Sequence, residues 1–201
     1  MLLLLLLLLP TTAALFSSLR MGGGPTRGAT LAKLLDLVSV SDRGLFADNN
    51  SRCKELIDLI EEEQVDFARR ENKNFSNRCQ GDWQLLWTTE KETLFFAKNG
   101  LFGAPCTTIS QSIDLQKGLI NNLIEFENGR KFSVLGSCTV AEADPRRFEF
   151  SFKSAQIVVP PFVNLSLPPV GKGNFVSVFC NDKYRMSKDS RGDYLCFARL
   201  G

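Results

Sequence analysis

Acidic and basic side chains that could do chemistry together gather near the C-terminus. Opposite charges fall around one predicted turn, at Asp182, Arg185, Asp189, Arg191 and Asp193. Two carboxylates can work as an acid–base pair only where a pocket raises the pKa of one of them. Arginine and carboxylate, by contrast, pair readily through two parallel hydrogen bonds. We therefore expect a structural clamp on a closing hairpin, with no catalytic role, made by Asp182, Arg185, Arg191 and Asp193.

Composition excludes several other kinds of site. The chain contains no histidine, which removes Ser-His-Asp and Cys-His nucleophilic sites and zinc sites built on imidazole. Its six cysteines include no Cys-x-x-Cys pair. We expect them to be buried free thiols in a reducing compartment, although three disulfides would be feasible in an oxidising one. The sequence thus predicts a protein that is not an enzyme and that holds no metal and no cofactor.

The charge balance argues against nucleic acid as a partner. Lysine and arginine total 24 against 22 acidic residues, a formal charge of +2, whereas phosphate binding needs a clustered basic excess. Hydrophobic residues make up 44% of the chain, and 16 phenylalanines accompany only 2 tyrosines and 2 tryptophans. Because phenylalanine has no polar group to satisfy, this composition favours a dry interior.

Large apolar side chains alternate along predicted strands, as they do on one face of a sheet. The candidates for an apolar cavity are Trp83, Leu85, Trp87, Phe148, Phe150, Phe152 and Phe175. They could line a site for an isoprenoid or acyl chain, or they could fill a solid core, because side chains alone can pack a small barrel. Each buried CH₂ group contributes about 0.8 kcal/mol, so such a ligand would require no charged residue.

The turns that separate these strands indicate an antiparallel sheet. Asn128-Gly129 lies between the strand patterns of residues 119–127 and 131–141, which is a strong hairpin signal. Asp144-Pro145 turns the chain into the stripe that begins at Phe148. Further short strands are predicted at residues 155–159, 175–180, 184–186 and 194–200. A meander of this kind loses its exposed edges when it closes into a barrel.

Apolar periodicity predicts short amphipathic helices before the strands. The first has Thr30 as its N-cap and an apolar stripe that reaches Val38, and the second begins at Asn50 or Ser51 with a stripe that reaches Ile60. We expect both to pack against the domain.

The first thirty residues have the features of a targeting leader. A run of leucines from Leu2 to Leu9 is too short to span a membrane and fits the apolar region of a signal peptide. The following residues 16–29 contain no acid, and Ala13-Ala14-Leu15-Phe16 looks like the junction of two-part plastid leaders in algae. We divide the chain into a leader, residues 1–30, and a folded domain, residues 31–201. The alternative is a secretory signal followed by a glycine-rich linker.

Residues 158–173 contain four of the eight prolines together with apolar residues such as Phe162 and Leu165. Proline cannot donate a hydrogen bond within a sheet, so this segment is predicted to be an edge strand or a long loop. It could act as a lid or touch a membrane near the barrel mouth, or it could simply cross the barrel end.

Motifs in fixed order carry a resemblance to a known family. They are Asp42-Arg43-Gly44-Leu45, then Gly81-Asp82-Trp83-Gln84-Leu85-Leu86-Trp87-Thr88-Thr89, then Pro169-Val170-Gly171-Lys172-Gly173, and last the stretch from Asn181-Asp182-Lys183-Tyr184-Arg185 to Asp189-Ser190-Arg191-Gly192-Asp193-Tyr194-Leu195. Over roughly residues 31–200 the chain resembles the plastid lipid-associated protein family, also called plastid fibrillins.

The resemblance implies a lipocalin-like barrel in plastids, at plastoglobules, thylakoids or in the stroma, and a lipid or carotenoid binder that is not an enzyme. Taken with the residues, it predicts a mainly β (α+β) fold, an antiparallel barrel with two short N-terminal helices. The expected partners are an apolar lipid or isoprenoid ligand and a plastoglobule or thylakoid surface. The alternatives are a secreted lipocalin-like carrier, or a scaffold that binds a plastid enzyme and has nothing in its barrel.

Overall fold

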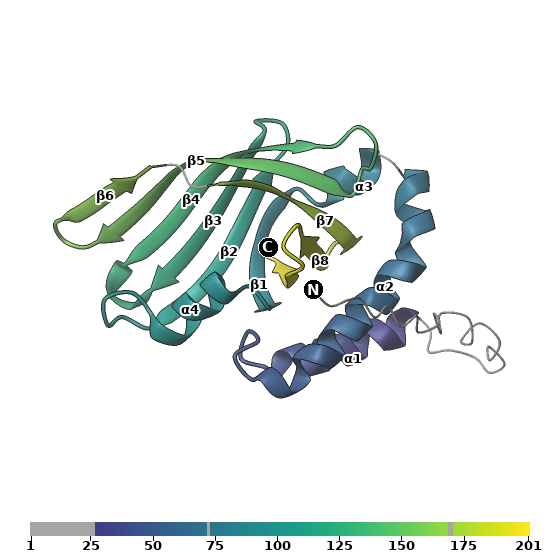
Figure 1. Ribbon diagram of the computed structural model, residues 1–201, viewed down its shortest axis with the longest axis horizontal. Coiled ribbons are helices and arrows are strands. Elements are labelled where there is room, and N and C mark those ends of the chain that lie inside the picture. Colours follow the sequence, from purple (N-terminus) through teal and green to yellow (C-terminus); the bar gives the residue numbers. More distant parts are fainter. Residues whose placement is uncertain (1–26, 72, 169–170) are drawn as a thin grey trace, which may run out of the picture.

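An antiparallel sheet runs through the structure, a computed structural model that describes residues 27–71, 73–168 and 171–201. In sheet order the strands are β4 (Lys131–Val140), β3 (Leu119–Phe126), β2 (Cys106–Asp114), β1 (Gly81–Thr88), β9 (Tyr194–Arg199), β8 (Tyr184–Asp189), β7 (Lys172–Cys180), β5 (Arg147–Val159) and β6 (Val163–Leu167). A further pairing of β4 with β5 closes all of these except β6 into an eight-stranded barrel. The predicted lipocalin-like antiparallel barrel is therefore confirmed (Figure 1).

Two sequence predictions fall partly outside the described residues. The leader assigned to residues 1–30 lies outside them except for its last four residues. Pro169 and Val170 of the third family motif lie outside them as well.

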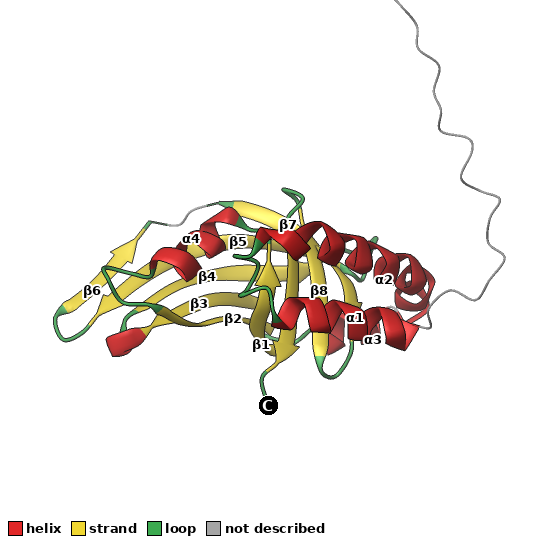
Figure 2. Ribbon diagram, turned by 90° about the horizontal axis from the view of Figure 1, so that it is seen from below, coloured by secondary structure: helices red, strands yellow, loops and turns green. Residues whose placement is uncertain are grey.

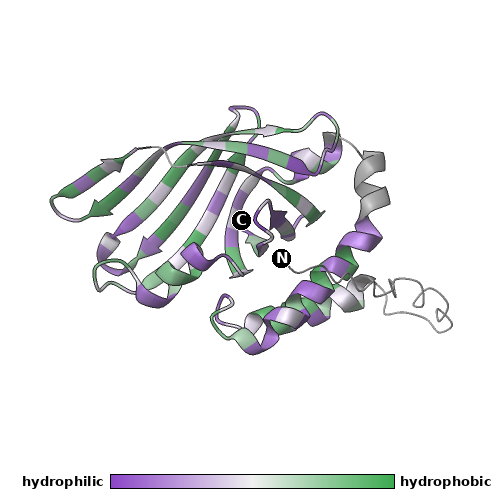
Figure 3. Ribbon diagram, in the orientation of Figure 1, coloured by the Kyte–Doolittle hydropathy of each residue, from purple (hydrophilic) through white to green (hydrophobic). Residues whose placement is uncertain are grey.

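Two of the turns predicted from the sequence connect consecutive strands of the sheet. Asn128 and Gly129 adopt positive φ angles of 60° and 73° in the turn from β3 to β4, a conformation that asparagine and glycine tolerate best. The backbone N–H of Arg147 donates to the Asp144 carbonyl at 2.9 Å and turns the chain into β5. Hydrophobic and hydrophilic residues alternate along the strands (Figure 3). Sequence analysis missed β2, because its apolar residues are widely separated by polar ones.

Strand β5 pairs with two different strands, β7 and β6, along the edge that faces away from β4. Residues 147–151 pair with β7 and complete the barrel, whereas residues 155–159 pair with β6. Between them the register with β4 shifts at Leu135/Gly136. The end of the sheet formed by residues 131–135 and by the β5–β6 hairpin, residues 155–167, which we call the lip, projects beyond the barrel (Figure 1). Residues 163–167 thus form the edge strand expected in this proline-rich segment.

Helices cover the outside of the barrel wall and its open end. They are α1 (Arg27–Ser39), α2 (Asn50–Glu71), α3 (Lys73–Arg78) and α4 (Lys91–Asn99), with short 3₁₀ turns at Ala47–Asn49 and Glu127–Gly129. The first two match the predicted helices, although α1 begins at Arg27, before Thr30, and α2 runs well past Ile60. Sequence analysis did not foresee α4, which lies across the end of the barrel next to the lip (Figure 2). We call this end the flared end. None of the helices in the described ranges is long and apolar enough to cross a membrane.

The wall of the barrel separates an inner core from an outer core. The inner core contains Trp83, Leu85 and Phe148, and the outer core lies between the barrel and the helices α1 and α2. Outer members include Leu34, Ile57, Ile60, Val178, Phe179, Met186 and Cys196. The helices are therefore fixed by burial of the apolar stripe that the sequence predicted.

Trp87 belongs to the outer core, which corrects the prediction that it shares a face with Trp83 and Leu85. A register shift between Leu85 and Trp87 in the β1–β9 pairing inserts an extra residue and turns the following side chain to the opposite face. There the Trp87 indole Nε1–H donates to the Asn50 side-chain oxygen at 2.9 Å. Trp87 is therefore an anchor for α2, not a cavity residue.

Candidate functional site

A cavity of about 370 Å³ opens at the flared end of the barrel. Its walls come from α4, the inner faces of β2–β5, the start of β7, and the turn between β8 and β9. Most of the surface is apolar, and the wall nearest α4 is aromatic. The Phe96 and Phe132 rings stack with centroids 5.2 Å apart, and the Phe150 and Phe152 rings lie 4.9 Å apart. Such a concave apolar site can hold a hydrocarbon chain.

The structure brings together only some of the predicted cavity residues. Leu85, Phe150, Phe152 and Phe175 line the cavity. Trp83 and Phe148 are completely buried in the inner core but do not line it. The Phe148 ring stacks on Phe175 at 4.9 Å and so supports one wall from behind.

Several lining residues escaped sequence analysis. They include Phe96, Ile109, Gln111, Asn122, Phe132, Val134 and Ser187. Strict alternation from Phe132 to Val134, directly after the Asn128-Gly129 turn, was a signal that could have identified two of them. Phe96 carried no comparable signal, because its helix α4 has only nine residues and is too short for a clear apolar stripe.

The floor of the cavity is polar, and a buried arginine lies beneath it. The Arg185 side chain is fully buried, and its guanidinium lies over the rings of Phe197 (4.4 Å), Trp83 (5.1 Å) and Phe175 (5.6 Å). Its Nη2 donates to the Gln111 side-chain oxygen. Gln111, Phe175 and Phe197 line the cavity. Arg185 is thus a residue of the barrel interior, which corrects its predicted role as a hairpin clamp.

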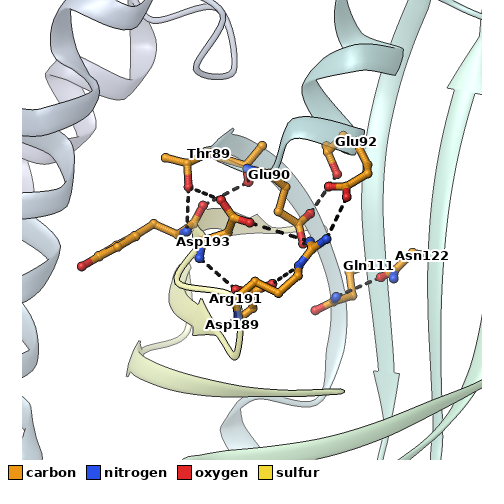
Figure 4. A network of polar contacts seen from close by, with 11 residues as sticks. Thr89, Glu90, Glu92, Gln111, Asn122, Asp189, Arg191 and Asp193 are labelled. Atoms are coloured by element: carbon orange, nitrogen blue, oxygen red, sulfur yellow. Dashed lines mark hydrogen bonds and ion pairs between the residues drawn. The ribbon is translucent and has the colours of Figure 1, made fainter. Parts of the chain in front are cut away.

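The predicted clamp forms at one end of strand β8, in the turn that connects β8 to β9. Arg191, in the β8–β9 turn, contacts Asp189 (3.0 Å), Glu90 (3.1 Å) and Glu92 (2.9 Å), which ties this turn to the start of α4 (Figure 4). Asp193 is 3.8 Å from Arg191 and accepts a hydrogen bond from the Thr89 hydroxyl at 2.9 Å. These carboxylates raise the pKa of Arg191, above all through the hydrogen bond to Asp189.

Asp182 takes no part in this network, because it lies at the opposite end of β8, in the turn that follows β7. There its main-chain carbonyl accepts a hydrogen bond from Arg199 Nε at 3.0 Å. The charges that appear adjacent in the sequence are therefore divided between the two ends of one strand. Burial also raises the pKa of Glu90 at the cavity rim.

The six cysteines are free thiols, and five of them are buried. Burial raises the pKa of Cys138 inside the barrel to about 11, and that of Cys196 in the outer core to about 12. Both are therefore protonated and weakly nucleophilic at neutral pH. No group of three or more potential metal ligands occurs among the described residues.

Comparison with known proteins gives a consistent result. The family model PAP_fibrillin matches residues 29–198. A curated relative from Arabidopsis thaliana, "Probable plastid-lipid-associated protein 11, chloroplastic", is 38% identical over 169 residues, which cover 83% of this chain and 77% of the relative.

Proposed function

Because the chain belongs to the PAP_fibrillin family of plastid lipid-associated proteins, we propose that its barrel sequesters an apolar lipid in a plastid and performs no chemistry on it. The observation that carries this proposal is the aromatic cavity at the flared end of the barrel. The apolar wall of this cavity suits a prenylquinone, a carotenoid or an acyl lipid. Each CH₂ group moved from water into it would contribute about 0.8 kcal/mol.

Plastid location is proposed from the Arabidopsis relative, whose name describes it as chloroplastic. Delivery through a two-part algal leader remains a prediction from residues 1–30. We further propose that the protein rests on a plastoglobule or thylakoid surface through its lip. Large apolar side chains are exposed there next to one another: Phe162 is 93% exposed, Val163 50% and Leu165 49%. Contiguous exposed apolar groups mark sites at which proteins contact membranes or other partners.

The first test is to identify what the cavity holds. The purified chain is incubated with a total plastid lipid extract, repurified and extracted for mass spectrometry. One dominant prenyl, carotenoid or acyl species near one molecule per protein supports the proposal. A protein that returns empty, or with traces of mixed polar lipids, contradicts it and favours a scaffold whose helices bind an enzyme. Glycans or disulfides on the native protein would instead favour a secreted carrier.

Replacing Phe162 and Leu165 together with serine is expected to lower partition onto lipid droplets or liposomes by about tenfold or more, because burying each such side chain contributes roughly 1.5–3 kcal/mol. Partition is measured by flotation. The melting temperature should stay unchanged, since both side chains are exposed in the free protein. Phe46→Ser, in the loop between α1 and α2, is the matched control, with a side chain 60% exposed. Equal loss in the control would contradict a role for the lip.

A further inference from the structure

Arg185 carries a buried positive charge that no carboxylate neutralises. Its side chain is 0% exposed, and among the described residues it forms no ion pair and its Nε and Nη1 have no hydrogen-bond partner. Burial lowers the pKa of Arg185 to about 10, so the guanidinium stays charged at neutral pH. A buried charge is costly unless a partner compensates it. The ring faces of Trp83 and Phe197 provide part of that compensation.

A second arginine adds to the positive potential below the cavity. The Arg199 guanidinium lies 4.1 Å from the Trp83 ring. Within the described part of the chain it donates only to main-chain carbonyls, those of Arg78, Gln80 and Asp182. The acids of the cavity, Glu90, Glu92 and Asp189, lie at the rim and pair with Arg191 there.

Hydrogen bonding from Arg185 fixes the orientation of the polar floor. Arginine can only donate, so Gln111 must present its oxygen to Arg185 and its Nε2 to the neighbouring strand. Gln111 Nε2 in turn donates to Asn122 Oδ1 at 2.9 Å (Figure 4), which leaves the amide N–H groups of Asn122 as donors. The buried Ser187 hydroxyl, also at the cavity lining, has no partner among the described residues. The groups left without a partner are therefore nearly all hydrogen-bond donors.

From this arrangement we propose that the cavity binds a long-chain carboxylate, such as a free fatty acid, with its head group at the floor formed by Gln111, Asn122 and Ser187 above Arg185. The carboxylate supplies the acceptor oxygens and the negative charge that the floor lacks. The hydrocarbon chain then runs past Phe150 and Phe152 toward the lip. This inference rests on the proposed function, and it adds a head-group specificity that the apolar wall alone does not provide.

The test compares two ligands that differ only in the head group. Dissociation constants of the full-length chain for oleate and for methyl oleate are measured by displacement of a neutral fluorescent polyene ester. Hydrogen bonds to charged groups imply a preference for oleate of about ten- to a hundredfold. Arg185→Met should abolish that preference and leave the affinity for methyl oleate within about twofold. Arg147→Met, which removes an exposed guanidinium that bonds Asn174 outside the barrel, should keep it.

A second variant covers the case in which Arg185→Met does not fold. Ser187→Ala removes a buried hydroxyl without a partner, so it should weaken oleate binding alone while the melting temperature is maintained. Equal affinity of the native protein for both ligands, or a preference that survives in both variants, overturns the head-group site and leaves lipid sequestration standing. Failure of the native protein to bind either ligand or the polyene ester overturns sequestration as well.

Discussion

Trp87→Ala is expected to destabilise the protein by about 3–5 kcal/mol, the usual cost of truncating a buried tryptophan. The side chain is fully buried in the outer core, and its indole N–H bonds Asn50 at the start of α2. The same region of β1 is tied to the loop after α1, because the Thr88 N–H donates to the Arg43 carbonyl at 3.1 Å. Removing the ring thus leaves a cavity at the joint between helices and barrel. Chemical denaturation followed by circular dichroism measures the loss.

Two controls separate packing from hydrogen bonding. Trp87→Phe keeps an aromatic ring but loses the bond to Asn50, so its loss of stability should be clearly smaller. Phe162→Ala truncates a ring that is 93% exposed and should change stability little. If Trp87→Ala were no less stable than Phe162→Ala, the assignment of Trp87 to a core between barrel and helices would be wrong.

Val134→Trp is expected to weaken binding of every chain-like lipid by about 50-fold, since displacing roughly three CH₂ groups costs about 0.8 kcal/mol each. Val134 faces the cavity and is the cross-strand neighbour of Asn122. An indole at this position would occupy the space between the polar floor and the aromatic wall. The free protein should keep its melting temperature, because the added volume enters an existing cavity.

The adjacent position on the same strand provides the matched control. Leu135 is 39% exposed and alternates with Val134, so Leu135→Trp places the same bulky side chain outside the cavity. Titration of both variants with the same lipid gives the two dissociation constants to be compared. Comparable loss of affinity in the two would show that the ligand does not occupy this cavity.

The barrel could be predicted because its signals are local. The Asn128-Gly129 turn and the alternation of Phe148, Phe150 and Phe152 each depend on neighbouring residues in the chain, and the structure contains both. Trp87 could not be placed in the same way. The extra residue that turns it outward arises from pairing with β9, which lies more than a hundred residues further along the chain. A periodicity of two cannot reveal such a register shift.

The polar floor was equally hidden in the sequence. Arg185 is close in sequence to Asp182 and Asp189, so pairing within a hairpin was the natural interpretation. On a strand, however, residues 185, 187 and 189 share the face toward the barrel interior, and Asp182 precedes the strand. The partner of Arg185 is Gln111, which comes from β2, a strand without a clear apolar pattern. Only tertiary structure brings these groups together.

The division of β5 between two neighbours has an evolutionary consequence. The ladder that closes the barrel uses residues 147–151, while the hairpin with β6 uses residues 155–159. Insertions or deletions that lengthen or shorten that hairpin in matched pairs would leave the closing ladder in register. Related chains are therefore expected to vary in length here more freely than at the β8–β9 turn, where Arg191 contacts α4. The size of the lip could thus diverge among homologues without loss of the fold.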